Sequence, residues 1–282
     1  MNISIEEIRE TTEKAELSLR KKFKKSIWCK FTKSINEYEL VQPNDKIAVC
    51  ISGGKDSMLM AKLFQELKRH DKFPFEVVFL VMDPGYNENN RLKIEENAAK
   101  LSVPVTIFES DIFGSVVHIE KNPCYICARM RRGYLYSKAK ELGCNKIALG
   151  HHFDDVIETI LLSMFYSGQY QTMMPKLHSE NFEGMELIRP MYLIREQDIL
   201  RWCKHNDLEF IRCACKFTEE DSTEHFSKRR EMKELIQEMK KTNPYIEKNI
   251  FKSAENVNIT QIVSYYNDDK VHHFLDTYDK EK

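Results

Sequence analysis

The sequence predicts an α/β protein built on a doubly wound parallel sheet, with helical extensions before and after it. Short apolar runs such as 47–51 and 75–82 have the continuity of buried parallel strands, and longer stretches with helical spacing follow them. Strands that alternate with helices in this way are typical of the α/β class. The first predicted strand is also followed by a glycine-rich turn, and such folds commonly bind phosphate at this point.

Length and composition fit one large domain with an appendage. The chain has 282 residues, of which 42% are hydrophobic, and its 43 lysines and arginines nearly balance its 44 aspartates and glutamates. No apolar run approaches the ~20 residues needed to span a bilayer, and the first residues lack the plan of a signal peptide. We therefore expect a cytoplasmic protein without a membrane partner.

The predicted elements begin with two helices between residues 5 and 38. The second carries an apolar stripe (Phe23, Ile27, Phe31, Ile35 and Tyr38), which we interpret as core or dimer contact. The predicted strands are 47–51, 75–82, 105–108, 146–149 and 208–211. The helices predicted after the first strand are 58–67, 90–101, 112–118, 129–142, one ending near 166, 197–205 and 223–241. The tail after Asn258 carries no motif.

The turn Ser52-Gly53-Gly54-Lys55-Asp56-Ser57 has the properties of a phosphate site. Its glycines let backbone N–H groups face inward, the start of the next helix adds partial positive charge, and Lys55 adds a full charge. It is not the P-loop of motor and switch NTPases, because Lys55 is followed by Asp rather than Ser or Thr. The alternative is an ordinary glycine-rich turn with Asp56 or Ser57 as helix cap.

Polar residues also follow two other predicted strands, at the edge where doubly wound sheets bind ligands. Met82 and Asp83 end the second strand and are candidates to line a nucleotide pocket, although Asp83 also suits a turn. The segment Gly150-His151-His152-Phe153-Asp154-Asp155 ends the fourth. Two histidines and two aspartates there suit a magnesium–nucleotide site, while helix capping is the alternative role for the aspartates.

The cysteines suggest a metal centre, since a disulfide framework is not expected in a reducing compartment. Cys124 and Cys127 are spaced to bind one centre, and Cys213 and Cys215 are the other paired candidates. Four thiolates would close a zinc site, whereas three would leave one iron of a [4Fe–4S] cluster open to a substrate sulfur. The tight Cys-x-Cys spacing favours the cluster; zinc and a redox dithiol are the alternatives. The other four are expected to be buried small hydrophobic residues: Cys29, Cys50, Cys144 and Cys203.

The turn resembles the SGGxDS loop of the PP-loop ATP pyrophosphatase superfamily. Residues 20–258 resemble the tRNA 2-thiocytidine synthetase family. The resemblance rests on four motifs in this order: the turn, Pro-Cys-x-x-Cys at 123–127, the His-His-x-Asp-Asp segment and the late cysteine. Segments 127–133, 149–155, 164–166, 174–177 and 189–190 also resemble it. The family commonly has Pro-Cys-x-x-Cys where this chain has Arg212-Cys213-Ala214-Cys215. Related 2-thiouridine synthetases, an alternative function, carry paired-cysteine zinc fingers, but the N-terminal region here has Cys29 alone.

The resemblance implies a Rossmann-like PP-loop ATPase domain at 41–215, flanked by helical extensions at 1–40 and 216–282. It implies ATP with Mg²⁺, a [4Fe–4S] cluster, a homodimer, a cysteine desulfurase or other sulfur donor, and thiolation of cytidine 32 in tRNA. A non-catalytic tRNA-binding or redox-sensing protein is the alternative from another class. The expected ATP-binding residues are Ser52, Gly53, Gly54, Lys55, Asp56, Ser57, Met82, Asp83 and Gly150. Catalysis is expected from Lys55, Asp56, His151, Asp154 and Asp155, cluster ligation from Cys124, Cys127 and Cys213 (or Cys215), and tRNA contact from Arg129, Arg131 and Arg132.

Overall fold

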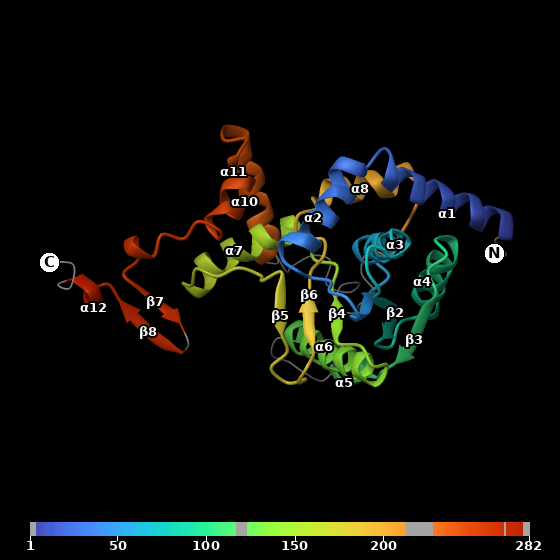
Figure 1. Cartoon of the computed structure of the whole chain (residues 1–282), viewed down its shortest axis with the longest axis horizontal. Coiled ribbons are helices and arrows are strands. Elements are labelled where there is room, and N and C mark those ends of the chain that lie inside the picture. The colour runs from blue at the N-terminus through green and yellow to red at the C-terminus, as the bar shows by residue number, and fades with distance from the viewer. Residues whose placement is uncertain (1–3, 117–122, 212–227, 268, 279–282) are drawn as a thin grey trace. The chain divides into compact units, whose positions relative to one another are not determined.

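The computed structural model describes residues 4–116, 123–211, 228–267 and 269–278 (Figure 1). Its main sheet has the strand order β3-β2-β1-β4-β6-β5, and its neighbouring strands are parallel except for β5, which is antiparallel to β6. The predicted α/β class with a parallel sheet is therefore confirmed. The strands are β1 Lys46–Ile51, β2 Glu76–Asp83, β3 Val105–Glu109, β4 Lys146–Ala148, β5 Lys176–His178 and β6 Glu186–Ile188.

Helices alternate with these strands and also precede and follow the sheet. Before the sheet come α1 Ile5–Arg20, the π-helix η1 Lys24–Trp28 and α2 Cys29–Glu37. Within it come α3 Lys55–Arg69, α4 Glu88–Lys100, α5 Ile112–Val116, α6 Pro123–Glu141, α7 Phe153–Ser167 and α8 Glu196–His205. After it come α10 Lys228–Thr242, α11 Ile246–Ser253, the 3₁₀ helix η2 Ile259–Gln261, strands β7 Ser264–Asn267 and β8 Lys270–His273, and α12 Leu275–Tyr278.

Both faces of the sheet are covered by helices, which explains why β1 is a continuous apolar run. Successive side chains of a strand point to opposite faces. Ile47 and Val49 join the core formed with α1 to α4 and α8, whereas Ala48 and Cys50 join the core formed with α6. Figure 1 shows α6 on one side of the strands and α3 and α8 on the other. Each fully buried large apolar side chain contributes roughly 1.5–3 kcal/mol to this packing.

The N-terminal apolar stripe belongs to the core of the sheet domain. Phe23, Ile27, Phe31 and Ile35 are buried there, and Tyr38 packs against the same cluster. The predicted second helix is present, but its first turn is π-helical. The domain boundaries predicted near residues 40 and 215 stay predictions.

The strand predicted at 208–211 is wrong, because these residues form no strand. A side-chain amide replaces the sheet partner: Asn97 Nδ2 donates a hydrogen bond to the Glu209 carbonyl oxygen at 2.9 Å. The prediction of Cys29 as buried is also wrong, since Cys29 is exposed, whereas Cys50, Cys144 and Cys203 are buried as expected. Strands β5 and β6 and the β7–β8 hairpin were not predicted.

The chain divides into two compact units, Met1–Val156 with Met173–Phe226 and Ile157–Thr172 with Ser227–Lys282. Ion pairs hold elements of the second unit together: Arg229 Nε lies 3.4 Å from Glu158 Oε2, and Lys240 Nζ lies 2.8 Å from Glu247 Oε2. The helix predicted at 223–241 is present as α10 from residue 228, and its first five predicted residues lie outside the described part. Helix α11 was not predicted as a separate element.

Among the described helices, none combines the length and the apolar character required to cross a membrane.

Candidate active site

The glycine-rich turn lies between the end of β1 and the start of α3, as predicted, and its serines fix its shape. Ser57 Oγ accepts a hydrogen bond from Ser52 N at 3.1 Å and donates one to the Gly54 carbonyl oxygen at 3.0 Å. Gly54 is the N-cap of α3. The amides of the turn therefore gather at a helix N-terminus, which favours an anion.

Two glycines of the site are required by close packing. Gly53 has a φ of +82°, and a Cβ added there would lie 2.5 Å from Ile94 Cγ1 and 2.8 Å from Ile211 Cδ1. A Cβ on Gly150 would lie 3.2 Å from Ser57 N, so the end of β4 closely approaches the backbone of α3. Both positions leave too little room for a larger residue.

Gly53→Ala is expected to destabilise the protein by about 1–3 kcal/mol, because left-handed backbone strain adds to overpacking. It should also weaken the binding of a phosphate ligand at the turn. Gly133→Ala is the matched control, since its added Cβ meets nothing within 4 Å and it lies within α6. That change should stabilise by about 0.5–1 kcal/mol, or leave stability unchanged. Urea unfolding of both variants measures this, and equal stability of Gly53→Ala and wild type would contradict it.

A cavity of about 410 Å³ opens beside the turn at the carboxyl ends of β1, β2 and β4. It brings together residues from four separate segments of the sequence. Nine of the predicted site residues line it: Ser52, Asp56, Ser57, Met82, Arg131, Arg132, Gly150, His151 and Asp155. This is the edge of the sheet where doubly wound folds bind nucleotides.

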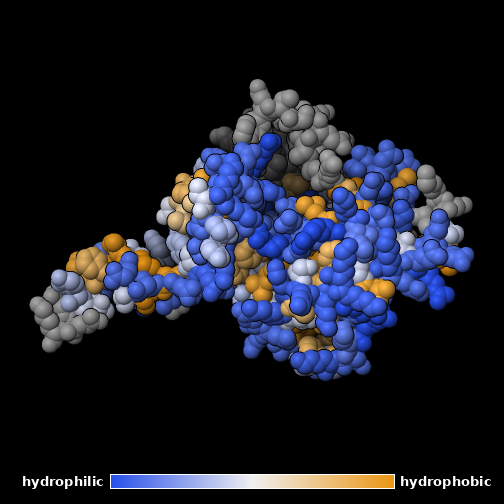
Figure 2. Space-filling view, turned by 90° about the horizontal axis from the view of Figure 1, so that it is seen from above, coloured by the Kyte–Doolittle hydropathy of each residue, from blue (hydrophilic) through white to orange (hydrophobic). Residues whose placement is uncertain are grey.

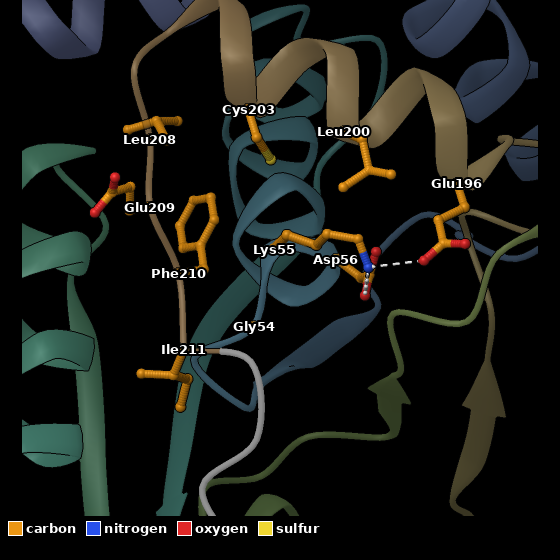
Figure 3. Close-up of a pocket in the computed structure, with 10 residues that line it drawn as sticks. All are labelled: Gly54, Lys55, Asp56, Glu196, Leu200, Cys203, Leu208, Glu209, Phe210 and Ile211. Atoms are coloured by element: carbon orange, nitrogen blue, oxygen red, sulfur yellow. Dashed lines mark hydrogen bonds and ion pairs between the residues drawn. The ribbon is translucent and has the colours of Figure 1, made fainter. Parts of the chain in front are cut away.

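A second cavity, of about 600 Å³, lies beside Gly54, Lys55 and Asp56 (Figure 3). Figure 3 shows the Phe210 ring, the Cys203 sulfur and the Leu200 side chain directed into it. Asp56 lines both cavities. A group transferred between two bound molecules would thus pass Asp56 and Lys55.

Lys55 is held between two carboxylates. Its Nζ lies 3.1 Å from Asp56 Oδ2 and 3.2 Å from Glu196 Oε1 (Figure 3). Burial alone would lower the pKa of Lys55, but the charges of Asp56 and Glu196 outweigh burial and raise that pKa. Lys55 therefore stays cationic and can neutralise phosphate charge.

Asp56 is a partly buried carboxyl with spare bonding capacity. Burial raises its pKa, although Lys55 and His152 oppose the shift. Its Oδ1 lies 3.9 Å from His152 Nε2 and, within the described residues, accepts no hydrogen bond. A buried carboxylate oxygen in this state suits a cation that enters with the nucleotide.

The two aspartates after β4 have different surroundings. Asp154 accepts hydrogen bonds from Arg195 Nη2 at 3.0 Å and from Glu196 N at 2.7 Å, so it fixes the start of α8. Asp155 Oδ2 accepts a hydrogen bond from His152 N at 2.9 Å, and Asp155 lines the cavity with His151. Asp154 thus positions Glu196, whereas Asp155 lines the cavity beside the turn.

Asp83 stabilises the turn that follows β2. Its Oδ1 accepts hydrogen bonds from the backbone N of Gly85 and Tyr86, and its Oδ2 lies 2.6 Å from Arg91 Nη1. Although burial opposes it, these hydrogen bonds and Arg91 lower the pKa of Asp83. Met82, not Asp83, lines the cavity.

The remaining predicted residues lie on or after α6. Arg129 is exposed, and Arg131 and Arg132 line the cavity beside the turn. Cys124 and Cys127 belong to the first turns of α6, three residues apart in the sequence. Cys127 is half-buried against Met82 and Ile112. Cys213 and Cys215 lie outside the described residues, and the described residues alone contain no group of three or more His, Cys, Asp and Glu side chains that could hold a metal ion.

Two residues of the site were not predicted. Glu196 reaches Lys55 from α8, and Phe210 lies in the second cavity. Glu196 lies at the start of a helix, so its sequence position alone suggests only a favourable helix dipole interaction. Phe210 lies two residues from the region of the late cysteines, which is the only signal that could have singled it out.

Comparison with known proteins assigns the class of this site. The model of the PP-loop domain family matches residues 23–222. The fold is similar to that of the U34-tRNA thiolase NcsA from Methanococcus maripaludis, solved with its [4Fe–4S] cluster. That likeness has a TM-score of 0.62 and 22% identity, and it covers 88% of this chain and 78% of that one. The chain is thus a PP-loop domain protein.

Two relatives identify the family within this class of PP-loop domain proteins. A tRNA-cytidine(32) 2-sulfurtransferase of Geotalea daltonii is 35% identical, over 80% of this chain and 88% of that protein. One from Polaromonas naphthalenivorans is 32% identical, over 96% of this chain and 86% of that protein. The chain belongs to the tRNA-cytidine(32) 2-sulfurtransferase family.

Proposed function

We propose that this protein is an ATP-dependent sulfurtransferase that replaces the C2 oxygen of cytidine 32 in tRNA by sulfur. The observation that carries the proposal is the pair Lys55 and Asp56, which lies between two cavities at the turn of a PP-loop domain. One cavity suits ATP and the other suits the nucleotide to be modified. Membership of the family supplies the identity of the base.

ATP would bind in the cavity at the carboxyl ends of the strands. The turn amides, Ser57 and Lys55 would hold the leaving pyrophosphate, with Lys55 kept cationic by its two carboxylates. Arg131 and Arg132 line this same cavity, so we propose that they contact the phosphates of ATP as well as any tRNA phosphate at its mouth. Arg129 is exposed and is proposed to contact tRNA alone.

Mg²⁺ fits the acidic side of this cavity. Asp155 lines it, and Asp56 Oδ1 is a buried oxygen that accepts no hydrogen bond among the described residues. Mg²⁺ commonly combines one or two carboxylates with substrate phosphates. We propose Asp56 and Asp155 as its ligands, with Asp154 holding α8 in place through Glu196 N.

The pyrimidine would enter the second cavity, where Phe210 offers a face for stacking. Its C2 oxygen would attack the α-phosphorus of ATP while the bond to pyrophosphate breaks. The resulting adenylate makes this oxygen a good leaving group. A sulfur nucleophile then attacks C2, and AMP leaves with the original oxygen.

The cysteines fit an iron–sulfur cluster. Cys124 and Cys127 belong to the first turns of α6, where backbone amides favour thiolates, and Cys127 is only half-buried. We propose Cys213 as the third ligand, with Cys215 as the alternative. When bound, the cluster supplies an iron that carries the sulfur to be transferred. The sulfur donor is proposed to be a cysteine desulfurase, and the protein to act as a cytoplasmic homodimer.

ATP is expected to be split between its α- and β-phosphates. With tRNA and a sulfur source, the product should be AMP and pyrophosphate in equal amounts, because the turn holds a pyrophosphate and not a transferred γ-phosphoryl group. Chromatography of the nucleotide products measures this. ADP as the main product would contradict the proposal.

A further inference from the structure

A pocket lined mainly by basic residues lies between η1 and α8, away from the turn. It has a volume of about 520 Å³ and is lined by Lys22, Phe23, Ser26, Arg201, Lys204 and His205. We call it the α8 basic pocket. None of the described residues that line it is a carboxylate, and Phe23 is buried beneath it. Figure 2, which views the molecule from the side of α2 and α8 in Figure 1, shows a mostly hydrophilic face.

The positive charge of this pocket is only partly neutralised. Lys22 and Lys204 form no ion pair with a carboxylate in the part of the chain that is described, and Lys22 Nζ lies 3.0 Å from His205 Nδ1. Of the nearby carboxylates, Asp207 lies 2.6 Å from Lys14, outside the pocket, and Asp198 pairs with Arg201 of the pocket. Two lysines are therefore free to bind an anion.

The pKa of His205 is lowered, in part by the positive charges around the pocket. Burial lowers it first, and the cations Lys22 and Lys14 lower it further, while Asp207 opposes them. The imidazole therefore adds little charge of its own near neutral pH, and it leaves Lys22 as a hydrogen-bond donor toward the pocket.

Helix α8 connects this pocket to the second cavity. Leu200 and Cys203 line the cavity beside Lys55, and the next residues along the helix, Arg201 and Lys204, line the basic pocket. A helix of ten residues is roughly 15 Å long, so the two sites lie within a few nucleotides of each other. An RNA with one base in the cavity can place a nearby phosphate over α8.

We propose that the α8 basic pocket binds a backbone phosphate of the tRNA substrate and thereby positions the RNA for entry of its target base. This inference rests on the proposed function. The chemistry favours RNA over an acidic protein surface, because the pocket offers lysine and arginine without the exposed aromatic anchors of protein interfaces.

The test is the salt dependence of tRNA binding. In Lys22→Glu/Lys204→Glu, the Kd for an unmodified tRNA transcript should rise about tenfold near 0.1 M salt. The slope of log K against log [salt] should fall by about 0.7–0.9 per lost contact. The KM for ATP and the rate at saturating tRNA should stay within about twofold of wild type.

Lys72→Glu is the control, since Lys72 is an exposed lysine that does not line the pocket. It should leave the Kd and the slope unchanged. If the double reversal disturbs folding, Lys22→Gln/Lys204→Gln gives the same comparison. An unchanged Kd and slope in a folded variant would overturn the inference, even if thiolation is normal. Failure of the proposed function would differ, because wild type itself would then not thiolate tRNA.

Discussion

Alanine at Cys124, Cys127 or Cys213 is expected to abolish tRNA thiolation and to prevent assembly of the cluster. Each change removes one of three thiolates, and a cluster with two protein ligands is not retained through purification. Wild type purified without oxygen should be brown and contain about four iron atoms per chain. Iron analysis and the visible spectrum report the cluster independently of activity.

Two other cysteines provide controls for this experiment. Cys29→Ala should keep both the cluster and activity, because Cys29 is exposed on α2. Cys215→Ala should keep the cluster if Cys213 is the third ligand. A colourless anaerobic wild type with one tightly bound zinc would contradict the iron–sulfur assignment. Loss of the cluster in Cys215→Ala but not in Cys213→Ala would move the third ligand by two residues.

Lys55→Ala is expected to lower the rate of AMP formation by about 10²–10³-fold, the usual effect of removing one charge-stabilising donor at a reacting centre. Its KM for tRNA should change little. Lys68→Ala is the matched control, since Lys68 is an exposed lysine near the other end of α3. A Lys55→Ala enzyme with the wild-type rate would contradict the role of Lys55 in holding pyrophosphate.

Asp56→Asn should lose activity to a similar extent without losing stability. Burial raises the pKa of Asp56, so the folded state binds this proton more tightly than the unfolded chain. Ionised Asp56 therefore destabilises the fold as pH rises from its unfolded pKa of about 3.9 through its raised folded value, above which the penalty is complete. The neutral amide of Asn removes this cost of burying a charge, and Lys55 keeps its ion pair with Glu196. Marked unfolding of Asp56→Asn at pH 7 would instead assign Asp56 a structural role.

Local signals were sufficient to predict the turn and four of the six strands of the main sheet, β1 to β4. Two glycines and Lys55 identify a phosphate site because the amides, the helix start and the charge all lie within six residues. The apolar runs of β1 and β2 identify buried strands because both faces are covered. The short run 208–211 has a similar composition but forms no strand. Its Glu209 carbonyl oxygen accepts a hydrogen bond from the side chain of Asn97 instead, and no local pattern in the sequence reveals this.

Pairs between distant segments could not be predicted. Asp154 and Arg195 are 41 residues apart, and no sequence pattern around either residue indicates that the two form a pair. For the same reason, the role of Asp154 in positioning Glu196, and hence Lys55, became visible only in three dimensions. The basic run 129–132 predicted charge near nucleic acid, but only the fold shows that Arg131 and Arg132 line the cavity of the turn.

Nucleoside mass spectrometry of treated tRNA tests the central claim most directly. An unmodified tRNA transcript with cytidine at position 32 is incubated with the cluster-loaded protein, ATP, Mg²⁺ and sulfide, then digested. The account predicts one 2-thiocytidine per tRNA, derived from position 32, and none when ATP is omitted. Formation of 2-thiouridine in place of 2-thiocytidine, or the absence of any thiolated nucleoside, would contradict it.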